Sequence, residues 1–119
     1  MLFVAIGGAA GSVLRYLTSV FTNRYFQGHF PLATFISNAV GCLLIGLLMG
    51  FFLKNNLAES NLKWLLVTGF CGGYTTFSTF SFENIALMQS QQYGTAFLYI
   101  TTSVIVGLAA VWCGLSLSR

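Results

Sequence analysis

Four long apolar segments make up almost the whole of this 119-residue chain. They lie at about Leu2–Phe21, Leu32–Leu53, Leu62–Gln89 and Tyr93–Leu117. A helix needs roughly 20 residues to cross a hydrocarbon core, and each segment reaches that length. Because 56% of the residues are hydrophobic and 6% are charged, a soluble domain of this size would leave much apolar surface in water. The sequence therefore predicts an all-α integral membrane protein, with residues 1–119 forming one domain of four transmembrane helices.

The third segment is interrupted near its middle by the run GFCGGYTTFSTFSFE, at Gly69–Glu83. Gly72 and Gly73 each lower helix propensity by about 1 kcal/mol relative to Ala. The hydroxyl groups that follow can bond to local backbone in place of the helical ladder. We therefore expect a break near Gly72–Thr79. A break at membrane depth persists only inside protein or beside a wet cavity, so this run indicates a permeation site.

Three further side chains are candidates for contact with a permeating ion. Phe77 and Phe80 are three residues apart and would share one face of a continuing helix, and the edge of an aromatic ring is positive. Asn38 is the one amide in the second segment, and its NH2 group could face an anion. The alternatives are ordinary core packing for the two rings and a hydrogen bond between helices for Asn38. Freed carbonyls at a break suit cations, whereas freed N–H groups and hydroxyls suit anions.

Two ionisable residues lie at membrane depth, where such groups are functional hypotheses by default. Arg15 lies past the middle of the first segment. It either extends to the interface or attracts anions into a vestibule. Glu83 follows the ring pair, and it could orient a hydroxyl, carry a proton or pair with a basic side chain. The sequence does not rank these alternatives.

Small residues recur at helical spacing in every segment, as Gly7/Gly11, Gly46/Gly50, Gly69/Gly73 and Ala110/Gly114. Such pairs let transmembrane backbones approach closely. They can serve packing within one chain. Because four helices make a thin bundle with little room for so many small faces, the pattern also predicts a homodimer.

The basic residues give only a weak orientation signal. Four crossings would place Lys54, Lys63 and Arg119 on one side of the membrane, against Arg24 on the other and Arg15 in the far half of its span. Orientation follows the Lys and Arg bias of short loops. With so small a bias, the chain is expected to insert in both orientations. The basic residues form no cluster that would indicate a nucleic-acid partner.

Three motifs together resemble the signatures of the Fluc/CrcB family of small fluoride channels. They are GGAAGSVLRY at Gly7–Tyr16, PLATFISNAVGCLLIG at Pro31–Gly46 and the third-segment run at Gly69–Glu83. The resemblance extends over essentially the whole chain, and TTFSTF after a glycine pair is highly specific.

The resemblance implies an antiparallel, dual-topology homodimer with two fluoride pores and a structural sodium ion at the dimer interface. By motif position, the sodium ligands would be the backbone carbonyls of Gly72 and Thr75. The implied fluoride contacts are Asn38, Phe77, Phe80 and a hydroxyl of Ser78 or Thr79. In the fourth segment the hydroxyl candidates are Tyr99, Thr102 and Ser103.

The function expected from the motifs is passive, fluoride-selective efflux through the cytoplasmic membrane. One alternative is a small multidrug cation/proton antiporter, but that carrier needs a membrane carboxylate, and the first segment has Arg15 without any Asp or Glu. Another is a non-transporting subunit of a larger membrane complex, for which the hydroxyl and Phe residues would be superfluous. The sequence has no Ser-His-Asp set, metal-ligand cluster or phosphate-binding loop, so no enzymatic activity and no cofactor other than sodium is expected.

Overall fold

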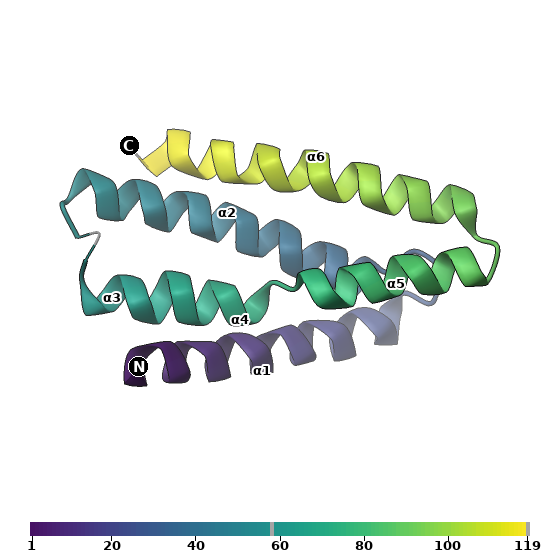
Figure 1. Cartoon of the computed structure of the whole chain (residues 1–119), viewed down its shortest axis with the longest axis horizontal. Helices are drawn as coiled ribbons and strands as arrows, with labels where there is room; N and C mark the ends of the chain where they lie inside the picture. Colours follow the sequence, from purple (N-terminus) through teal and green to yellow (C-terminus); the bar gives the residue numbers. More distant parts are fainter. Residues whose placement is uncertain (58, 119) are drawn as a thin grey trace.

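The computed structural model describes residues 1–57 and 59–118, and all regular secondary structure in these ranges is helical. Arg119, which the charge comparison included, lies outside the described residues. Figure 1 shows both ends of the chain at one end of the molecule, beside the connection that follows α2 (Leu32–Lys54). The connections before α2 and before α6 (Tyr93–Ser118) lie at the opposite end.

Three of the described helices, α1 (Leu2–Tyr25), α2 and α6, are long and apolar enough to cross a membrane. They correspond to the first, second and fourth predicted segments. The first helix ends at Tyr25 and not at Phe21. Arg24 lies in its last turn, where a cation stabilises the negative end of the helix dipole. Apolarity alone therefore underestimates how far this helix continues.

The third segment is broken, as predicted. A continuous helical run contains α3 (Asn61–Lys63), the π-helix η1 (Trp64–Cys71) and α4 (Gly72–Tyr74). Thr75 and Thr76 then have extended backbone, with ψ angles of 158° and 123°. The helix resumes as α5 (Phe77–Gln89).

The break is narrower than the predicted span, and Gly72 and Gly73 are not part of it. Both glycines are helical. A Cβ atom on Gly73 would lie 2.6 Å from the Gly8 carbonyl oxygen, so this glycine permits close contact with α1. Thr76 starts the new helix instead, because its hydroxyl oxygen accepts a hydrogen bond from the Thr79 backbone N–H at 3.2 Å.

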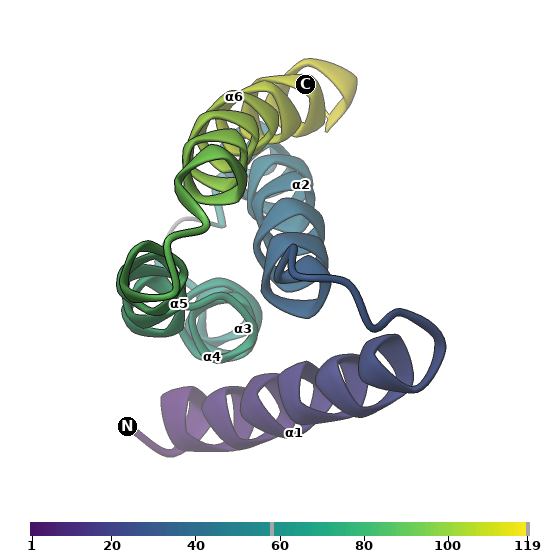
Figure 2. The same cartoon turned by 90° about the vertical axis from the view of Figure 1, so that its right-hand side faces the viewer.

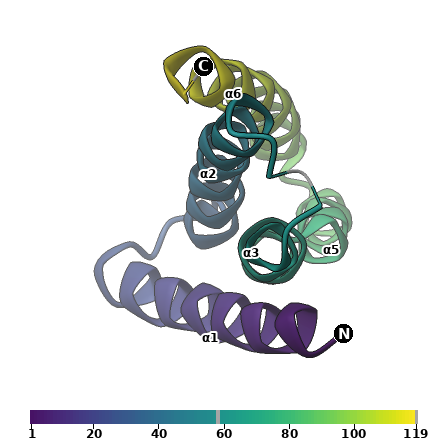
Figure 3. The same ribbon diagram turned by 90° about the vertical axis from the view of Figure 1, so that its left-hand side faces the viewer.

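The small-residue pairs make two close contacts inside the chain. Gly7 and Gly69 allow α1 to touch η1, where a Cβ atom on Gly69 would lie 3.0 Å from the Gly7 Cα atom. Gly46 and Gly114 allow α2 to touch α6, where a Cβ atom on Gly114 would lie 2.6 Å from the Leu43 carbonyl oxygen. Figures 2 and 3 show α2 along α6 on one side of the third segment and α1 on the other. The glycine pattern therefore has a use within one chain.

Substitution of Gly46 tests the contact between α2 and α6. A Cβ atom there would overlap the Val111 carbonyl oxygen, so Gly46→Ala should lower the free energy of unfolding by about 1–3 kcal/mol. A Cβ atom on Gly94 would have no neighbour within 4 Å. Gly94→Ala is therefore a matched control, expected to be neutral or to stabilise by no more than about 1 kcal/mol. Unfolding in mixed detergent micelles gives both values, and equal stability of the two variants would contradict this contact.

Candidate functional site

Asn38 on α2 pairs with the break in the third segment. Its Nδ2 donates to the Thr76 carbonyl oxygen at 3.1 Å, and its Oδ1 accepts from the Thr76 N–H at 2.8 Å. The amide thus takes up the Thr76 N–H, which would bond to the Gly72 carbonyl in an unbroken helix, and adds a second bond to the Thr76 carbonyl at the start of α5. This is the hydrogen bond between helices that the sequence left as one alternative. Because an amide NH2 group has two protons, one donor proton remains beyond this pairing.

The break removes the helical donors of four carbonyl groups, those of Gly72, Gly73, Tyr74 and Thr75. In an unbroken helix the Thr76 N–H would bond to the Gly72 carbonyl, but it donates to Asn38. The Thr79 N–H would likewise bond to the Thr75 carbonyl, but it donates to the Thr76 hydroxyl. The oxygens of Gly72 and Thr75, which are the two predicted sodium ligands, are therefore two of the four carbonyls that the break frees. Backbone oxygens of this kind suit a hard cation.

The two phenylalanine rings lie together on one side of the break, as their spacing predicts. Their centroids are 5.9 Å apart, and the ring planes meet at 37°. Phe80 also packs against the Tyr99 ring at 4.9 Å, whereas Phe77 is 78% exposed. Both rings line a cavity of about 310 Å³, here called the aromatic groove, together with Asn38, Thr75, Thr76 and Ser103.

The three hydroxyl candidates of the fourth segment, Tyr99, Thr102 and Ser103, lie in different surroundings. Ser103 lines the aromatic groove, and its hydroxyl oxygen is buried without a hydrogen-bond partner in the described part of the chain. Thr102 donates to the Leu98 carbonyl of its own helix at 2.6 Å and lines neither described cavity. Tyr99 is fully buried behind Phe80. Ser103 therefore lines the site, Tyr99 lines neither described cavity but contacts the site through Phe80, and Thr102 lies outside it.

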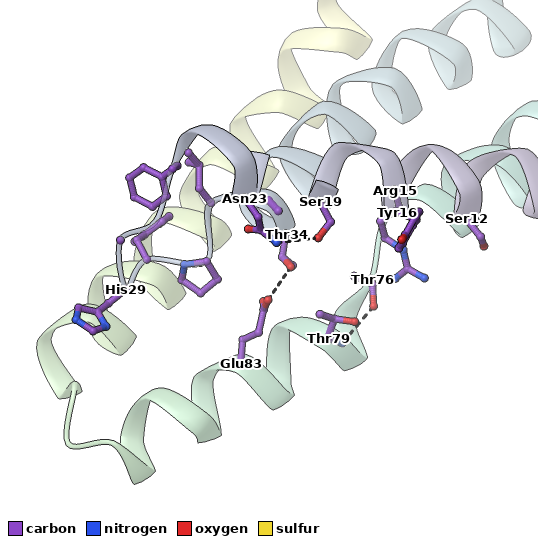
Figure 4. Close-up of a pocket in the computed structure, with 16 residues that line it drawn as sticks. Ser12, Arg15, Tyr16, Ser19, Asn23, His29, Thr34, Thr76, Thr79 and Glu83 are labelled. Atoms are coloured by element: carbon purple, nitrogen blue, oxygen red, sulfur yellow. Dashed lines mark hydrogen bonds between the residues drawn. The ribbon is translucent and has the colours of Figure 1, made fainter. Parts of the chain in front are cut away.

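A second cavity, of about 380 Å³, opens at the end of the molecule that carries the α1–α2 connection. This cavity, here called the vestibule, has Arg15 and Ser19 of α1 on one wall and Thr79 and Glu83 of α5 on another (Figure 4). Arg15 thus lies where the vestibule alternative requires. Thr76 lines both cavities, so the break separates the vestibule from the aromatic groove.

Glu83 orients two hydroxyl groups, which is the first of its three predicted roles. Its Oε2 accepts a hydrogen bond from the Thr34 hydroxyl at 3.0 Å, and its Oε1 accepts one from the Tyr99 hydroxyl at 2.8 Å. Thr34 and Tyr99 belong to α2 and α6, so the carboxylate joins three helices. Because the Tyr99 ring touches Phe80, this network connects the vestibule with the aromatic groove.

The two hydroxyl residues after Phe77 take different positions. Thr79 lines the vestibule. Ser78 is exposed, lines neither described cavity, and shares a hydrogen bond with the Thr76 hydroxyl at 3.2 Å. Thr34 and Thr76 are site residues that the sequence analysis missed. The signal for Thr34 was available, because it lies one helical turn before Asn38 and therefore on the same face of α2.

Comparisons with known proteins agree with the three motifs. The family model described as "CrcB-like protein, Camphor Resistance (CrcB)" matches residues 2–115. A protein of Flavobacterium psychrophilum is 56% identical, with the match covering 98% of this chain and 94% of that protein. A protein of Azobacteroides pseudotrichonymphae is 48% identical over 98% of this chain and 93% of its own length. A protein of Pseudomonas putida is 47% identical, with the match covering 98% of this chain and 94% of that protein.

Each of these three relatives is named "Fluoride-specific ion channel FluC". The matches extend over almost the full length of both proteins in every pair, so they include all three motifs and both cavities. Together with the match to the family model, they show that this chain belongs to the CrcB-like family.

Proposed function

We propose that this membrane protein is a fluoride-selective channel through which fluoride leaves the cytoplasm passively. The names of its relatives support fluoride as the ion. The observation that carries the proposal is the broken third segment, which places an amide, an unpartnered hydroxyl and two rings beside one groove. A channel makes and breaks no covalent bonds, so the chain is not an enzyme.

The chemistry of the aromatic groove fits a small anion that holds its water tightly. Selective passage requires donors that replace the hydration shell at short range. Asn38 keeps one free amide proton, Ser103 offers a hydroxyl, and the rings of Phe77 and Phe80 have positive edges. No Lys or Arg lines the groove among the described residues. Binding therefore stays weak enough for release, which conduction requires.

The two other functions considered from the sequence, a multidrug antiporter and a non-transporting subunit, fit the site less well. In a multidrug antiporter the membrane carboxylate must be open to exchange protons for a cationic drug. Both oxygens of Glu83 instead accept hydrogen bonds from hydroxyl groups. A purely structural subunit would have no use for a groove and a vestibule that meet at one break.

Efflux from liposomes tests the function and the two rings. The purified wild-type protein should release fluoride from loaded liposomes and retain chloride. Phe77→Ile and Phe80→Ile should each reduce fluoride release at least about tenfold, because loss of about 1.4 kcal/mol of ion stabilisation corresponds to a factor of ten. Phe97→Ile is a control, since Phe97 is 73% exposed on α6 and lines neither described cavity. Unchanged release by the two groove variants would remove the rings from the pathway.

Asn38→Asp tests the amide. A carboxylate there would still accept from the Thr76 N–H, but it could not donate to the Thr76 carbonyl or to an anion. Its charge would also repel fluoride. We expect fluoride current to fall at least about tenfold. Asn55→Asp is the matched control, because Asn55 is exposed and, among the described residues, its side chain bonds only to the Phe51 carbonyl of α2. Wild-type current in Asn38→Asp would contradict a pathway past this residue.

The proposed assembly is an antiparallel homodimer in the cytoplasmic membrane with two pores, in which α3 to α5 form the third of four spans. An aromatic groove open on the outside of the chain supports a second copy, because Phe77 is 78% exposed beside it. Glycine contacts within the chain no longer support the dimer, since one chain uses them. The weak bias between Lys54 and Lys63 on one side and Arg24 on the other supports insertion in both orientations. The bacterial relatives support the cytoplasmic membrane.

A structural sodium ion is proposed at the dimer interface. The freed carbonyl oxygens of Gly72 and Thr75 are ligands of the right type, and a second copy would supply the same pair again. The described residues contain no cluster of His, Cys, Asp or Glu that would favour a transition metal. When bound, the ion would supply a fixed positive charge at the break. No transport of sodium is implied.

Mass and melting temperature test the dimer and the sodium site together. Light scattering with correction for detergent should give twice the 12.9 kDa of one chain. Replacing K⁺ by Na⁺ at constant ionic strength should raise the melting temperature, because a ligand at a hundredfold excess over its Kd stabilises by about 2.7 kcal/mol. A monomeric mass would refute the dimer. Equal melting temperatures in both salts would refute the sodium site.

A further inference from the structure

A hydrogen bond between α1 and the third segment lies outside both cavities. The Thr18 and Tyr74 hydroxyl oxygens are 2.9 Å apart, although the residues are far apart in sequence. Tyr74 is 8% exposed, and its ring stacks on that of Phe70 with centroids 6.1 Å apart and planes at 11°. The ring is therefore held firmly, directly before the extended residues of the break.

The position of this bond along α1 is informative. The close backbone contacts of α1 end near Gly11, where a Cβ atom would lie 2.8 Å from the Tyr74 backbone nitrogen. Beyond that point α1 forms the vestibule wall that includes Arg15 and Ser19. Among the described residues, Thr18–Tyr74 is the only side-chain hydrogen bond from α1 to another helix. It therefore holds the half of α1 that has no glycine contact.

Thr18 lies three residues after Arg15, so the Thr18–Tyr74 hydrogen bond lies within one helical turn of the Arg15 side chain. The Thr18 hydroxyl also donates to the Leu14 carbonyl at 2.9 Å, which leaves its lone pairs free to accept from Tyr74. The described vestibule contains Arg15 and His29 as groups able to carry positive charge and Glu83 as the carboxylate. The potential that an entering anion meets depends on how far Arg15 lies from Glu83 across the cavity.

We propose that Thr18 and Tyr74 are positioning residues that hold Arg15 at the vestibule wall and thereby increase the supply of anions to the break. The proposal rests on the function proposed above. Without the bond, the outer half of α1 moves away from the third segment. The favourable potential of Arg15 at the entrance then decreases, while the groove that selects the ion stays unchanged.

Electrical recordings of fluoride current at two salt concentrations test the proposal. Tyr74→Phe and Thr18→Val each remove the bond and keep the side-chain size. Both should lower the fluoride current about twofold at about 0.01 M salt, where the Debye length is about 30 Å. At about 1 M salt, where it is about 3 Å, the current should equal that of the wild type. Thr18→Ser keeps the hydroxyl and should behave as the wild type at both concentrations.

A double-mutant cycle with Arg15→Gln separates positioning from a structural role. Once Arg15 is neutral, adding Tyr74→Phe should cause no further loss of current at low salt. Equal fractional losses in both backgrounds, or equal losses at low and high salt, would refute the proposal. Tyr93→Phe is the matched control, because Tyr93 is 63% exposed and lines neither described cavity. Absence of fluoride current in the wild type would instead refute the proposed function.

Discussion

The two hydrogen bonds between the Asn38 amide and the Thr76 peptide groups are the interaction on which the rest of the site depends. An unpaired backbone group in a hydrocarbon environment costs several kcal/mol, so the Thr76 N–H, which the break deprives of its helical acceptor, needs another acceptor. Asn38 supplies it from a neighbouring helix and also donates to the Thr76 carbonyl. Since the Thr76 N–H is thereby taken, the Gly72 carbonyl is freed, and the Thr76 hydroxyl is left to start α5. The Asn38 pairing and the Thr76 cap together fix where α4 ends and α5 begins.

Two glycine contacts give the break a rigid setting. Gly46 and Gly114 join α2 to α6, while Gly7 and Gly69 join α1 to η1. The third segment lies between α1 on one side and the α2–α6 pair on the other. The cavities form where it changes partners: η1 and α4 contact α1, whereas α5 contacts α6. A straight helix would stay with one partner along its whole length. The break therefore lets one segment serve both halves of the chain and leaves space on each side of Thr76.

The sequence predicts the helices well because membrane thickness and apolarity act locally, and it predicts the presence of a break from its glycine and hydroxyl content. What the sequence does not predict depends on contacts between distant segments. Gly72 and Gly73 are helical because Gly73 must admit the backbone of Gly8, a contact between distant segments. The π-helix η1 likewise has no signal in its own residues. The site residues Asn38, Phe77, Phe80, Tyr99 and Ser103 lie around the break. Helical spacing places Thr34 on the face of α2 that carries Asn38, but its bond to Glu83 depends on the placement of α5 beside α2.

The carboxylate of Glu83 beside a path for anions requires a physical account. A free carboxylate would repel fluoride, but here both oxygens accept hydrogen bonds, from Thr34 and Tyr99, so the surrounding hydroxyl dipoles offset part of its charge. Arg15 lies in the same vestibule and supplies the opposite sign. An entrance with Arg15 alone would hold an anion too strongly for rapid release, and one with Glu83 alone would exclude it. Together they permit entry with weak binding, while the Tyr99 ring holds Phe80 in place on the far side of the same network.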